Sequence, residues 1–155
     1  MLLKNFLKCQ PIFRGLSDRD LDALAHAIEV REHPDKHTII QEGRSGKELY
    51  LLIEGQVSVV KYNLKNGQPE QINLVQPGEL FGLLSLIDHL ITSATCISSG
   101  PVKIGVLQRN AYNLLTQASA PIAHGFQIAT AKQLASLLRH QEKALRVVPI
   151  KLNDQ

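Results

Sequence analysis

The sequence holds only two cysteines, Cys9 and Cys96. Two cysteines cannot build a disulfide framework, and they cannot by themselves supply the four ligands of a structural zinc site. A reducing compartment is the simple expectation from this cysteine usage. We therefore predict a cytoplasmic protein.

Long apolar runs are also missing. No stretch reaches the ~18–20 apolar residues that a membrane-spanning helix needs. The first eight residues carry Lys4 and Lys8, and they lack the ~7-residue apolar core of a secretion signal. We interpret them as a short amphipathic helix, and we expect no membrane partner.

Charge of one sign is not in large excess. The chain has 17 Lys and Arg against 14 Asp and Glu, a net charge of +3, and its basic residues are scattered. Nucleic-acid-binding proteins usually gather their basic residues on one face. With 155 residues, 44% of them apolar and 20% charged, the chain has the length and composition of one folded domain and not of a disordered segment.

Common catalytic and metal-binding motifs are absent. The sequence contains no Gly-X-Ser-X-Gly, no glycine-rich phosphate loop ending in Lys-Ser/Thr, and no His-X-His of the kind that metal-binding jelly-roll enzymes carry on a strand. Cys96 falls inside a predicted strand, where it is interpreted as a small buried apolar group. We expect no catalysis, no cofactor and no metal.

The first clear element is a helix over residues 17–28. Ser17 and Asp20 form a capping box, and Leu16 and Leu21 are placed to form a hydrophobic staple. Apolar residues then recur at helical spacing as far as Ile28.

Residues 37–107 have a β-type pattern. Short apolar runs at 38–40, 49–53, 57–62, 72–75, 94–97 and 102–107 are separated by turns rich in Gly, Pro and Asn, including a hairpin signal at 66–67. Many short strands at such spacing favour a sandwich or barrel. Residues 83–90 are nearly all apolar, and we predict a short helix there between strands.

The end of the chain is predicted to be helical again. A short helix is indicated over 109–115, and Ser119 with Pro121 marks the start of a helix of ~25 residues. At 1.5 Å per residue this helix is about 38 Å long, so part of it should project from the domain. The predicted organisation of the single domain 1–155 is N-terminal helices over about 1–28, a β-roll over about 29–107 and C-terminal helices over about 109–147.

The order of the turns carries a resemblance. Residues 42–50 read EGRSGKELY, 55–57 read GQV, 66–67 read NG and 77–82 read PGELFG. This order, over about residues 12–140, closely resembles the cyclic-nucleotide-binding domain family of catabolite activator proteins, protein kinase A regulatory subunits and cyclic-nucleotide-gated channels. The resemblance implies an α+β, mainly β fold: an eight-stranded antiparallel jelly roll flanked by N-terminal helices and a long C-terminal helix.

The resemblance also locates a phosphate-binding cassette. The family pattern Phe-Gly-Glu-Leu-Ala-Leu followed by Pro-Arg-Ala-Ala-Thr is matched here by FGLLSL at 81–86 and ITSAT at 91–95. The implied ligand-binding positions are Phe81, Gly82, Leu83, Leu84, Ser85, Thr92, Ser93 and Ala94. In the family, the Phe-Gly pair opens a short helix whose free N–H groups face the cyclic phosphate, a favourable place for an anion.

Two departures from the cassette pattern bear on function. Leu83 stands where the family has the Glu that binds the ribose 2′-hydroxyl, and Thr92 stands where it has the Arg that pairs with the phosphate. Loss of a buried ionic partner costs about 2–5 kcal/mol, and an unpaired ribose hydroxyl costs about 1–3 kcal/mol. Together these losses correspond to roughly two to six decades of affinity. Restoring both family residues at once is expected to recover measurable cyclic-nucleotide affinity.

The cassette has become apolar. The residues concerned are Leu83, Leu84, Leu86, Ile87, Leu90 and Ile91. Three roles are open for them: they fill the vacant pocket, they line a site for a more apolar effector, or they form a surface for a protein partner. His89, in the same loop, is interpreted as a solvated histidine.

The C-terminal helix completes the prediction. In the family it caps the pocket and forms the dimer seam, and the resemblance assigns these roles to Phe126, Leu134, Leu137 and Leu138, with Ile122 and Ala129 on the same faces. A helix-turn-helix after this helix would need ~60–70 more residues, so we expect no direct DNA binding. The prediction is a non-catalytic regulatory module that senses another small-molecule effector or binds a protein partner, with a possible homodimer. The alternative is a cAMP or cGMP sensor with an altered binding mode.

Overall fold

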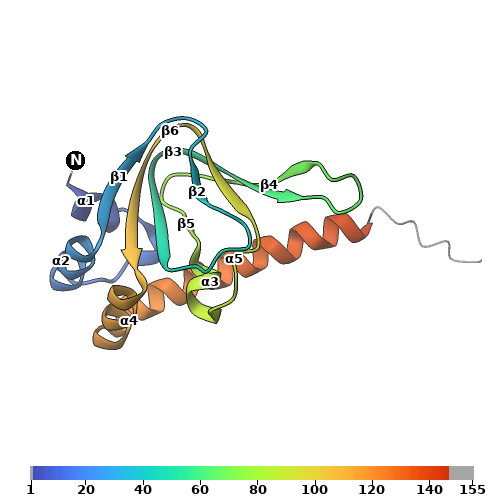
Figure 1. Cartoon of the computed structure of the whole chain (residues 1–155). Coiled ribbons are helices and arrows are strands. Elements are labelled where there is room, and N and C mark those ends of the chain that lie inside the picture. Colours follow the sequence, from blue (N-terminus) through green and yellow to red (C-terminus); the bar gives the residue numbers. More distant parts are fainter. Residues whose placement is uncertain (1, 147–155) are drawn as a thin grey trace, which may run out of the picture.

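A computed structural model describes residues 2–146. Helices from the N-terminal and C-terminal parts of the chain pack beside an antiparallel sheet that folds into a roll (Figure 1). The elements in chain order are α1 (Leu3–Lys8), η1 (Pro11–Phe13), α2 (Asp18–Ala27), β1 (Glu29–His33), β2 (Thr38–Ile40), β3 (Glu48–Tyr62), β4 (Pro69–Val75), β5 (Leu80–Phe81), α3 (Leu83–Asp88), β6 (Thr95–Gln108), α4 (Arg109–Ala118) and α5 (Ala120–Arg146).

Helix α2 begins where its capping signal predicts. The Ser17 hydroxyl accepts a hydrogen bond from the Asp20 amide at 3.1 Å, which satisfies one of the free donors of the first turn. The helix ends one residue before the predicted boundary, because Ile28 has extended backbone angles, φ −90° and ψ 123°. The buried side chains of Leu21 and Leu24 face the rest of the molecule.

The sheet is antiparallel throughout, with strand order β1-β6-β3-β4; β2 also pairs with β6, and β5 with β3. In two cases, two strands that the sequence predicts separately form one long strand. Residues 49–53 and 57–62 merge into β3, and 94–97 and 102–107 merge into β6. Counted as halves, these strands together with β1, β2, β4 and β5 make the eight of the predicted jelly roll, and the predicted fold class is confirmed.

The bend in β3 depends on Gly55. This residue has φ +92°, and a Cβ there would lie 2.5 Å from the Pro101 carbonyl oxygen on β6. The register between β3 and β6 shifts between Leu52 and Glu54 and again between Glu54 and Gln56, across this glycine. A glycine therefore lets the two long strands continue together through a bulge.

Both faces of the first part of β3 are buried, which explains the uninterrupted apolar run at residues 49–53. Leu49 and Leu51 belong to a core shared with the N-terminal helices, α3 and α5. Leu52 belongs to a second core inside the roll, which includes Phe81 and Cys96. Because side chains alternate along a strand, one strand contributes to both cores.

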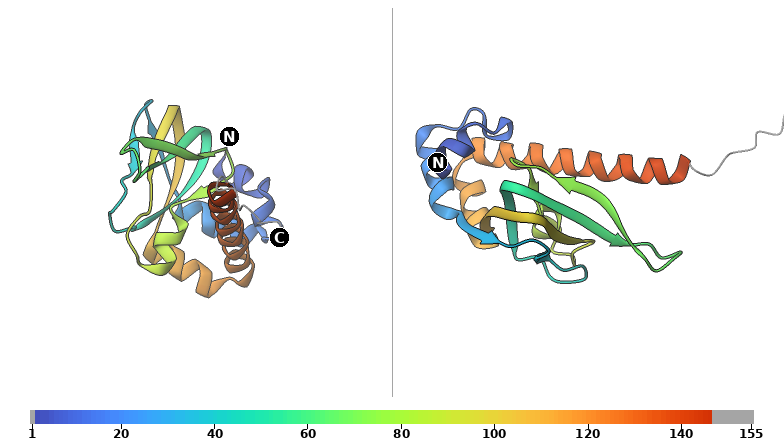
Figure 2. Two further views of the ribbon diagram at one scale, coloured as in Figure 1. Left: turned by 90° about the vertical axis from the view of Figure 1, so that its right-hand side faces the viewer. Right: turned by 90° about the horizontal axis from the view of Figure 1, so that it is seen from above.

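Helix α5 starts at the predicted cap and is 27 residues long. The Ser119 hydroxyl accepts a hydrogen bond from the Ile122 amide at 3.3 Å. The helix runs along the roll toward the end where the hairpin of β3 and β4 projects (Figures 1 and 2). Within residues 2–146, no helix combines the length and apolar character needed to cross a bilayer.

Candidate ligand-binding site

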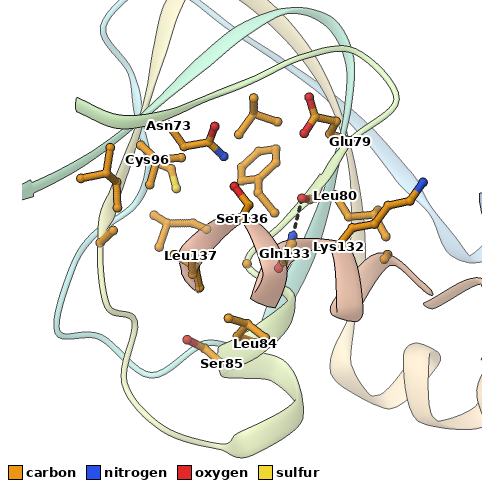
Figure 3. A pocket seen from close by; sticks show the side chains of 18 of the residues that line it. Asn73, Glu79, Leu80, Leu84, Ser85, Cys96, Lys132, Gln133, Ser136 and Leu137 are labelled. Carbon is orange, nitrogen blue, oxygen red and sulfur yellow. Dashed lines mark hydrogen bonds between the residues drawn. The ribbon is translucent and has the colours of Figure 1, made fainter. Parts of the chain in front are cut away.

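A cavity of about 430 Å³ lies between the roll and α5. It falls in the size range of pockets that bind small molecules, about 300–1,000 Å³. Strands β2, β3, β4 and β6, the segment from Pro77 to Gly82, helix α3 and residues 92–94 form its walls on the side of the roll. Helix α5 forms the opposite wall (Figure 3).

The structure brings most of the predicted cassette positions to this cavity. The residues that line it are Phe81, Gly82, Leu84, Ser85, Thr92, Ser93 and Ala94. They come from two segments, 81–85 and 92–94, which are separated by six residues and which α3 and its following loop bring to the same wall.

Leu83 is the exception, because it does not line the cavity. Its side chain is fully buried in the core formed by β3, α3 and the flanking helices. Leu86, one helical turn later, lies in the same core. The first turn of α3 is therefore oriented so that the Leu83 side chain points into the protein interior. The Leu84 side chain faces the cavity instead (Figure 3).

Both the side chain and the backbone of Thr92 form hydrogen bonds within the protein. Its side chain is buried, and its hydroxyl donates to the Gln41 carbonyl oxygen at 2.5 Å and accepts from the Arg44 amide at 3.1 Å. Its own amide donates to the Arg44 carbonyl oxygen at 2.8 Å, and its carbonyl oxygen accepts from the Gly43 amide at 2.8 Å. These bonds attach the loop between β2 and β3 to the cassette, so the hydroxyl already has a donor and an acceptor as partners.

The other apolar residues of the cassette do not fill the cavity. Ile87, Leu90 and Ile91 are exposed. Leu86 is buried, but in the adjacent core and not in the cavity. His89 is exposed and has φ +59°, where it ends α3. Of the three roles open to the apolar cassette, the self-filled pocket is not the arrangement in the structure.

Gly82 fixes the start of α3. It has φ +78°, and a Cβ there would lie 3.0 Å from Ile40 Cδ1 and 3.1 Å from Tyr50 Cδ2. The left-handed backbone and the close neighbours both favour glycine. Tyr50 in turn stacks on Phe81 with ring centroids 5.2 Å apart.

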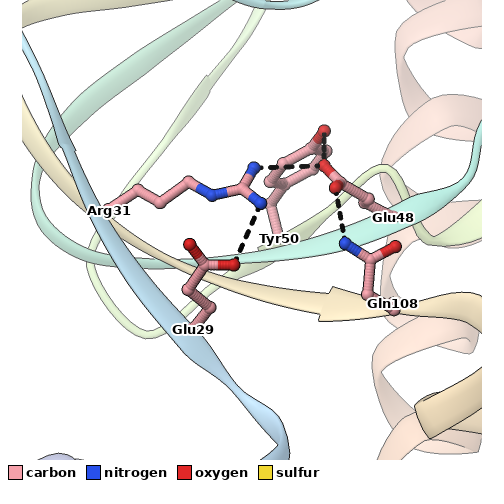
Figure 4. Close-up of polar contacts among 5 residues, drawn as sticks. All are labelled: Glu29, Arg31, Glu48, Tyr50 and Gln108. Carbon is pink, nitrogen blue, oxygen red and sulfur yellow. Dashed lines mark hydrogen bonds and ion pairs between the residues drawn. The ribbon is translucent and has the colours of Figure 1, made fainter.

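A polar group on the sheet holds Tyr50 in place (Figure 4). Its hydroxyl donates to Glu48 at 2.8 Å, and the Gln108 amide donates to the other oxygen of the same carboxylate at 2.7 Å. Arg31 approaches Glu48 at 3.5 Å and Glu29 at 3.1 Å. Burial, followed by the hydrogen bond with Glu48, raises the pKa of Tyr50 above its usual range. This hydrogen-bond network therefore holds the Tyr50 ring in place against Phe81 of the cassette.

The α5 wall contributes residues that the sequence did not single out. Lys132, Gln133, Ser136 and His140 line the cavity from α5, and Asn73 lines it from β4. The Gln133 amide nitrogen donates to the Leu80 carbonyl oxygen at 2.5 Å, which connects α5 to the strand before the cassette (Figure 3). Their spacing along α5, at intervals of three and four residues, was the available signal, but it is also the spacing of any helix face.

The four positions assigned to the cap and the dimer seam have different environments. Phe126 is a core residue that packs edge-on against Phe13 and Tyr112. Leu137 lines the cavity. Leu134 and Leu138 are exposed, at 46% and 61%. Phe126 is therefore unavailable to a dimer seam, while Leu134 and Leu138 are accessible.

Cys96 lines the deep part of the cavity as a thiol. It is buried, and that burial raises its pKa to about 12. The protonated form is a weak nucleophile. In the described part of the chain, no three His, Cys, Asp or Glu side chains are grouped closely enough to hold a metal ion.

Comparison with known proteins identifies the family. The model of the cyclic nucleotide-binding domain matches residues 30–119. The chain belongs to the cyclic nucleotide-binding domain family. The matched segment contains the whole cassette wall of the cavity, whereas the α5 wall lies beyond it.

Individual relatives agree with this assignment. The cyclic AMP receptor protein of Thermus thermophilus is 30% identical over 128 residues, which are 83% of this chain and 59% of the relative. The crystal structure of the Thermus thermophilus catabolite activator protein superposes with a TM-score of 0.74 at 30% identity, covering 89% of this chain and 62% of that one. The chain spans less than two thirds of the length of either relative.

A third relative is known from its solved structure. It is the regulatory subunit of a cAMP-independent protein kinase A from Trypanosoma cruzi, bound to guanosine. It has a TM-score of 0.69 and 25% identity, and the match covers 77% of this chain and 41% of that one. The family thus includes both cyclic-nucleotide receptors and a kinase regulatory subunit bound to a nucleoside.

Proposed function

We propose that this cyclic nucleotide-binding domain is a non-catalytic regulatory module that binds a small effector in the α5-covered cavity and binds cAMP and cGMP weakly. The observation that carries the proposal is the environment of Thr92. This residue occupies the position of the family's phosphate-binding Arg, and its hydroxyl is committed to Gln41 and Arg44. It offers a cyclic phosphate neither a positive charge nor a free hydrogen bond.

The size of the loss follows from the chemistry of phosphate recognition. A guanidinium binds a phosphate through two charge-assisted hydrogen bonds, which a hydroxyl cannot reproduce. Removing one partner of a buried charge pair costs about 2–5 kcal/mol. A micromolar site would therefore become one of roughly 30 µM to several millimolar. The side chain at position 83 adds no contact to the ligand, because it points into the core.

An open cavity supports ligand binding even without that ion pair. The cavity has the volume of a small-molecule site, and its walls combine apolar side chains with a few polar groups. The Trypanosoma cruzi relative bound to guanosine supports the idea that a member of this family can hold a ligand without a phosphate.

A second candidate function is cAMP or cGMP sensing with an altered binding mode. The observation that favours it is the position of Arg44. The backbone amide and carbonyl oxygen of Arg44 both form hydrogen bonds with Thr92, and the Arg44 side chain is exposed. An exposed arginine beside the cassette is placed to approach a phosphate from the loop between β2 and β3. In that case Arg44 would take the role of the arginine that position 92 lacks.

Interaction with another protein, including a second copy of the chain, is also proposed. Leu134 and Leu138 lie one helical turn apart on α5 and expose apolar surface. Burial of such a pair against the same pair of a second chain would form a two-fold helix seam. Cytoplasmic location and the absence of catalytic activity remain part of the same proposal.

Isothermal titration of the full chain with cAMP and cGMP tests the proposal. The expected result is a dissociation constant above about 30 µM for both nucleotides. Binding tighter than 10 µM contradicts weak binding. Arg44→Ala then separates the second candidate: if the nucleotide binds tightly and this variant loses it, Arg44 holds the phosphate.

A further inference from the structure

Electric charge is unevenly distributed around the cavity. Among the lining residues that the structure describes, Glu79 is the acidic side chain, and Lys132 and His140 on α5 are the basic ones. Glu79 and Lys132 are exposed. Glu79 already accepts a hydrogen bond from the Gln76 amide at 3.1 Å. Figure 3 shows the Lys132 ammonium pointing away from the centre of the cavity.

At the cassette end of the cavity, none of the lining residues among the described residues 2–146 carries a formal charge. Its walls there are Ile40, Phe81, Leu84 and Cys96, with the hydroxyls of Ser85 and Ser93. Burial keeps the Cys96 thiol protonated. An anion placed among these groups would lose its hydration without gaining a cation, which is strongly unfavourable.

Polar side chains of β4 and α5 line the side of the cavity opposite the cassette. Asn73 on β4 and Ser136 on α5 face the same space (Figure 3). The Asn73 Oδ1 accepts from the Leu74 amide at 2.9 Å, which leaves its NH₂ group to donate. Gln133 uses its NH₂ group on Leu80, which leaves its carbonyl oxygen to accept. These groups can orient the polar edge of a ligand without selecting a charge.

We propose that the cavity takes an uncharged ligand of nucleoside size, with its polar edge against Asn73 and Ser136 and no group that requires a cation at the cassette. This inference rests on the proposed function and narrows it to a ligand class. It follows that a phosphate, which strengthens binding in a receptor with a cationic cassette, weakens binding here.

The test compares ligands that differ only by the phosphate. Adenosine and guanosine are titrated against the full chain beside cAMP and cGMP at the same ionic strength. We expect each nucleoside to bind at least tenfold more tightly than its cyclic monophosphate. Equal or tighter binding of the cyclic monophosphates overturns the inference. Absence of binding by all four ligands also overturns it, and leaves the proposal of weak cyclic-nucleotide binding standing.

Three variants assign the effect to residues. Asn73→Ala is expected to weaken nucleoside binding at least fivefold, whereas the matched Asn113→Ala, on the exposed face of α4, leaves it unchanged. Lys132→Met is expected to change nucleoside affinity less than twofold. A large loss in Lys132→Met would show that a charged contact at α5 holds the ligand, which contradicts the inference.

The reverse change supplies the missing cation. Ser93 lines the cavity from an exposed position, so Ser93→Arg adds a guanidinium at the cassette with little disturbance of the core. We expect this variant to reduce the preference for nucleoside over cyclic monophosphate at least tenfold. An unchanged ratio in a folded Ser93→Arg protein would show that cassette charge does not set the preference.

Discussion

Thr92 and Arg44 are joined by two hydrogen bonds, one from the Thr92 amide to the Arg44 carbonyl oxygen at 2.8 Å and one from the Arg44 amide to the Thr92 hydroxyl at 3.1 Å. The same hydroxyl donates to Gln41. The position to which the resemblance assigns the family's phosphate-binding Arg is here a structural connection between two loops. Substitution of Thr92 therefore changes the anchoring of the loop as well as the ligand site.

Removal of the Thr92 hydroxyl should destabilise the protein. Thr92→Val keeps the shape of the side chain but leaves the Gln41 carbonyl and the Arg44 amide without this partner. We expect a loss of about 1–3 kcal/mol in the free energy of unfolding, measured by urea denaturation. Thr92→Ser keeps the hydroxyl and should cost less than half as much. Equal stability of wild type and Thr92→Val would contradict the structural role.

Leu83 and Leu84 are neighbours with opposite environments, which gives a second prediction. Leu83→Glu places a carboxylate in a fully buried apolar core, and we expect a loss of at least ~3 kcal/mol of unfolding free energy. Leu84→Glu places the same group on the wall of an open cavity and should cost about 1 kcal/mol or less. Urea denaturation of the two variants under identical conditions makes the comparison.

This pair also changes an expectation drawn from the sequence. The sequence alone predicts that restoring the family's Glu at position 83 and Arg at position 92 recovers cyclic-nucleotide affinity. In the structure the first change charges a core, and the second removes the bonds to Gln41 and Arg44. We now expect the double variant to be too unstable to bind. A stable Leu83→Glu protein with cyclic-nucleotide affinity would show that the first turn of α3 can rotate Leu83 toward the cavity.

Local signals were sufficient to predict much of the fold. The Ser17 cap and the Ser119 start each depend on residues within one helical turn, and both helices begin there. Strand β1 was missed because its sequence, EVREH, is mostly charged and only partly buried. Strand β5 was missed because it is two residues long and exists through pairing with distant β3. Such pairing has no local signature.

The candidate site was less predictable than the fold. The motif located the cassette, and seven of its eight predicted residues line the cavity. The direction of Leu83 could not be read from the motif, because it depends on how α3 packs against a core assembled from seven other elements. The contributions of Asn73 and Ser136 depend on α5 folding back over the roll, which no local pattern specifies.

Gly82 and Gly67 give a prediction about the cassette backbone. Both have positive φ, +78° and +67°, but a Cβ at Gly82 would meet Ile40 and Tyr50, whereas nothing lies within 4 Å at Gly67. Both Ala variants carry the backbone strain of about 1 kcal/mol. We expect Gly82→Ala to cost at least 1 kcal/mol more than Gly67→Ala in chemical denaturation. Equal costs would mean that the neighbours of Gly82 yield freely.

Cys96 gives a prediction about reactivity. With its pKa raised to about 12 by burial, only about one Cys96 side chain in 10⁴ is a thiolate at pH 8. Cys9 is exposed. Ellman's reagent should therefore detect one thiol per chain in the native protein and two in guanidinium chloride. Cys9→Ser should abolish the native signal, and rapid labelling of this variant would contradict the buried environment of Cys96.

The same shift predicts a dependence of stability on pH. The folded pKa of Cys96 lies above its ordinary value of 9.0, so the unfolded chain loses the proton first as pH rises. The contribution to stability is complete below pH 9 and is lost progressively as pH rises toward 12. Cys96→Ala should have a flatter stability profile than wild type over this interval, measured by urea denaturation at each pH.

Leu134 and Leu138 allow a test of self-association. Both are exposed and one turn apart on α5, so Glu at both positions would place like charges opposite each other in a two-fold seam. We expect wild type to be dimeric and the Leu134→Glu, Leu138→Glu protein monomeric at 200 µM by light scattering. Leu114→Glu on α4 replaces a leucine that is more exposed, at 69%; it is the control and should remain dimeric. A monomeric wild type at this concentration would rule out the seam, and loss of dimer in the control would place the contact on a different surface.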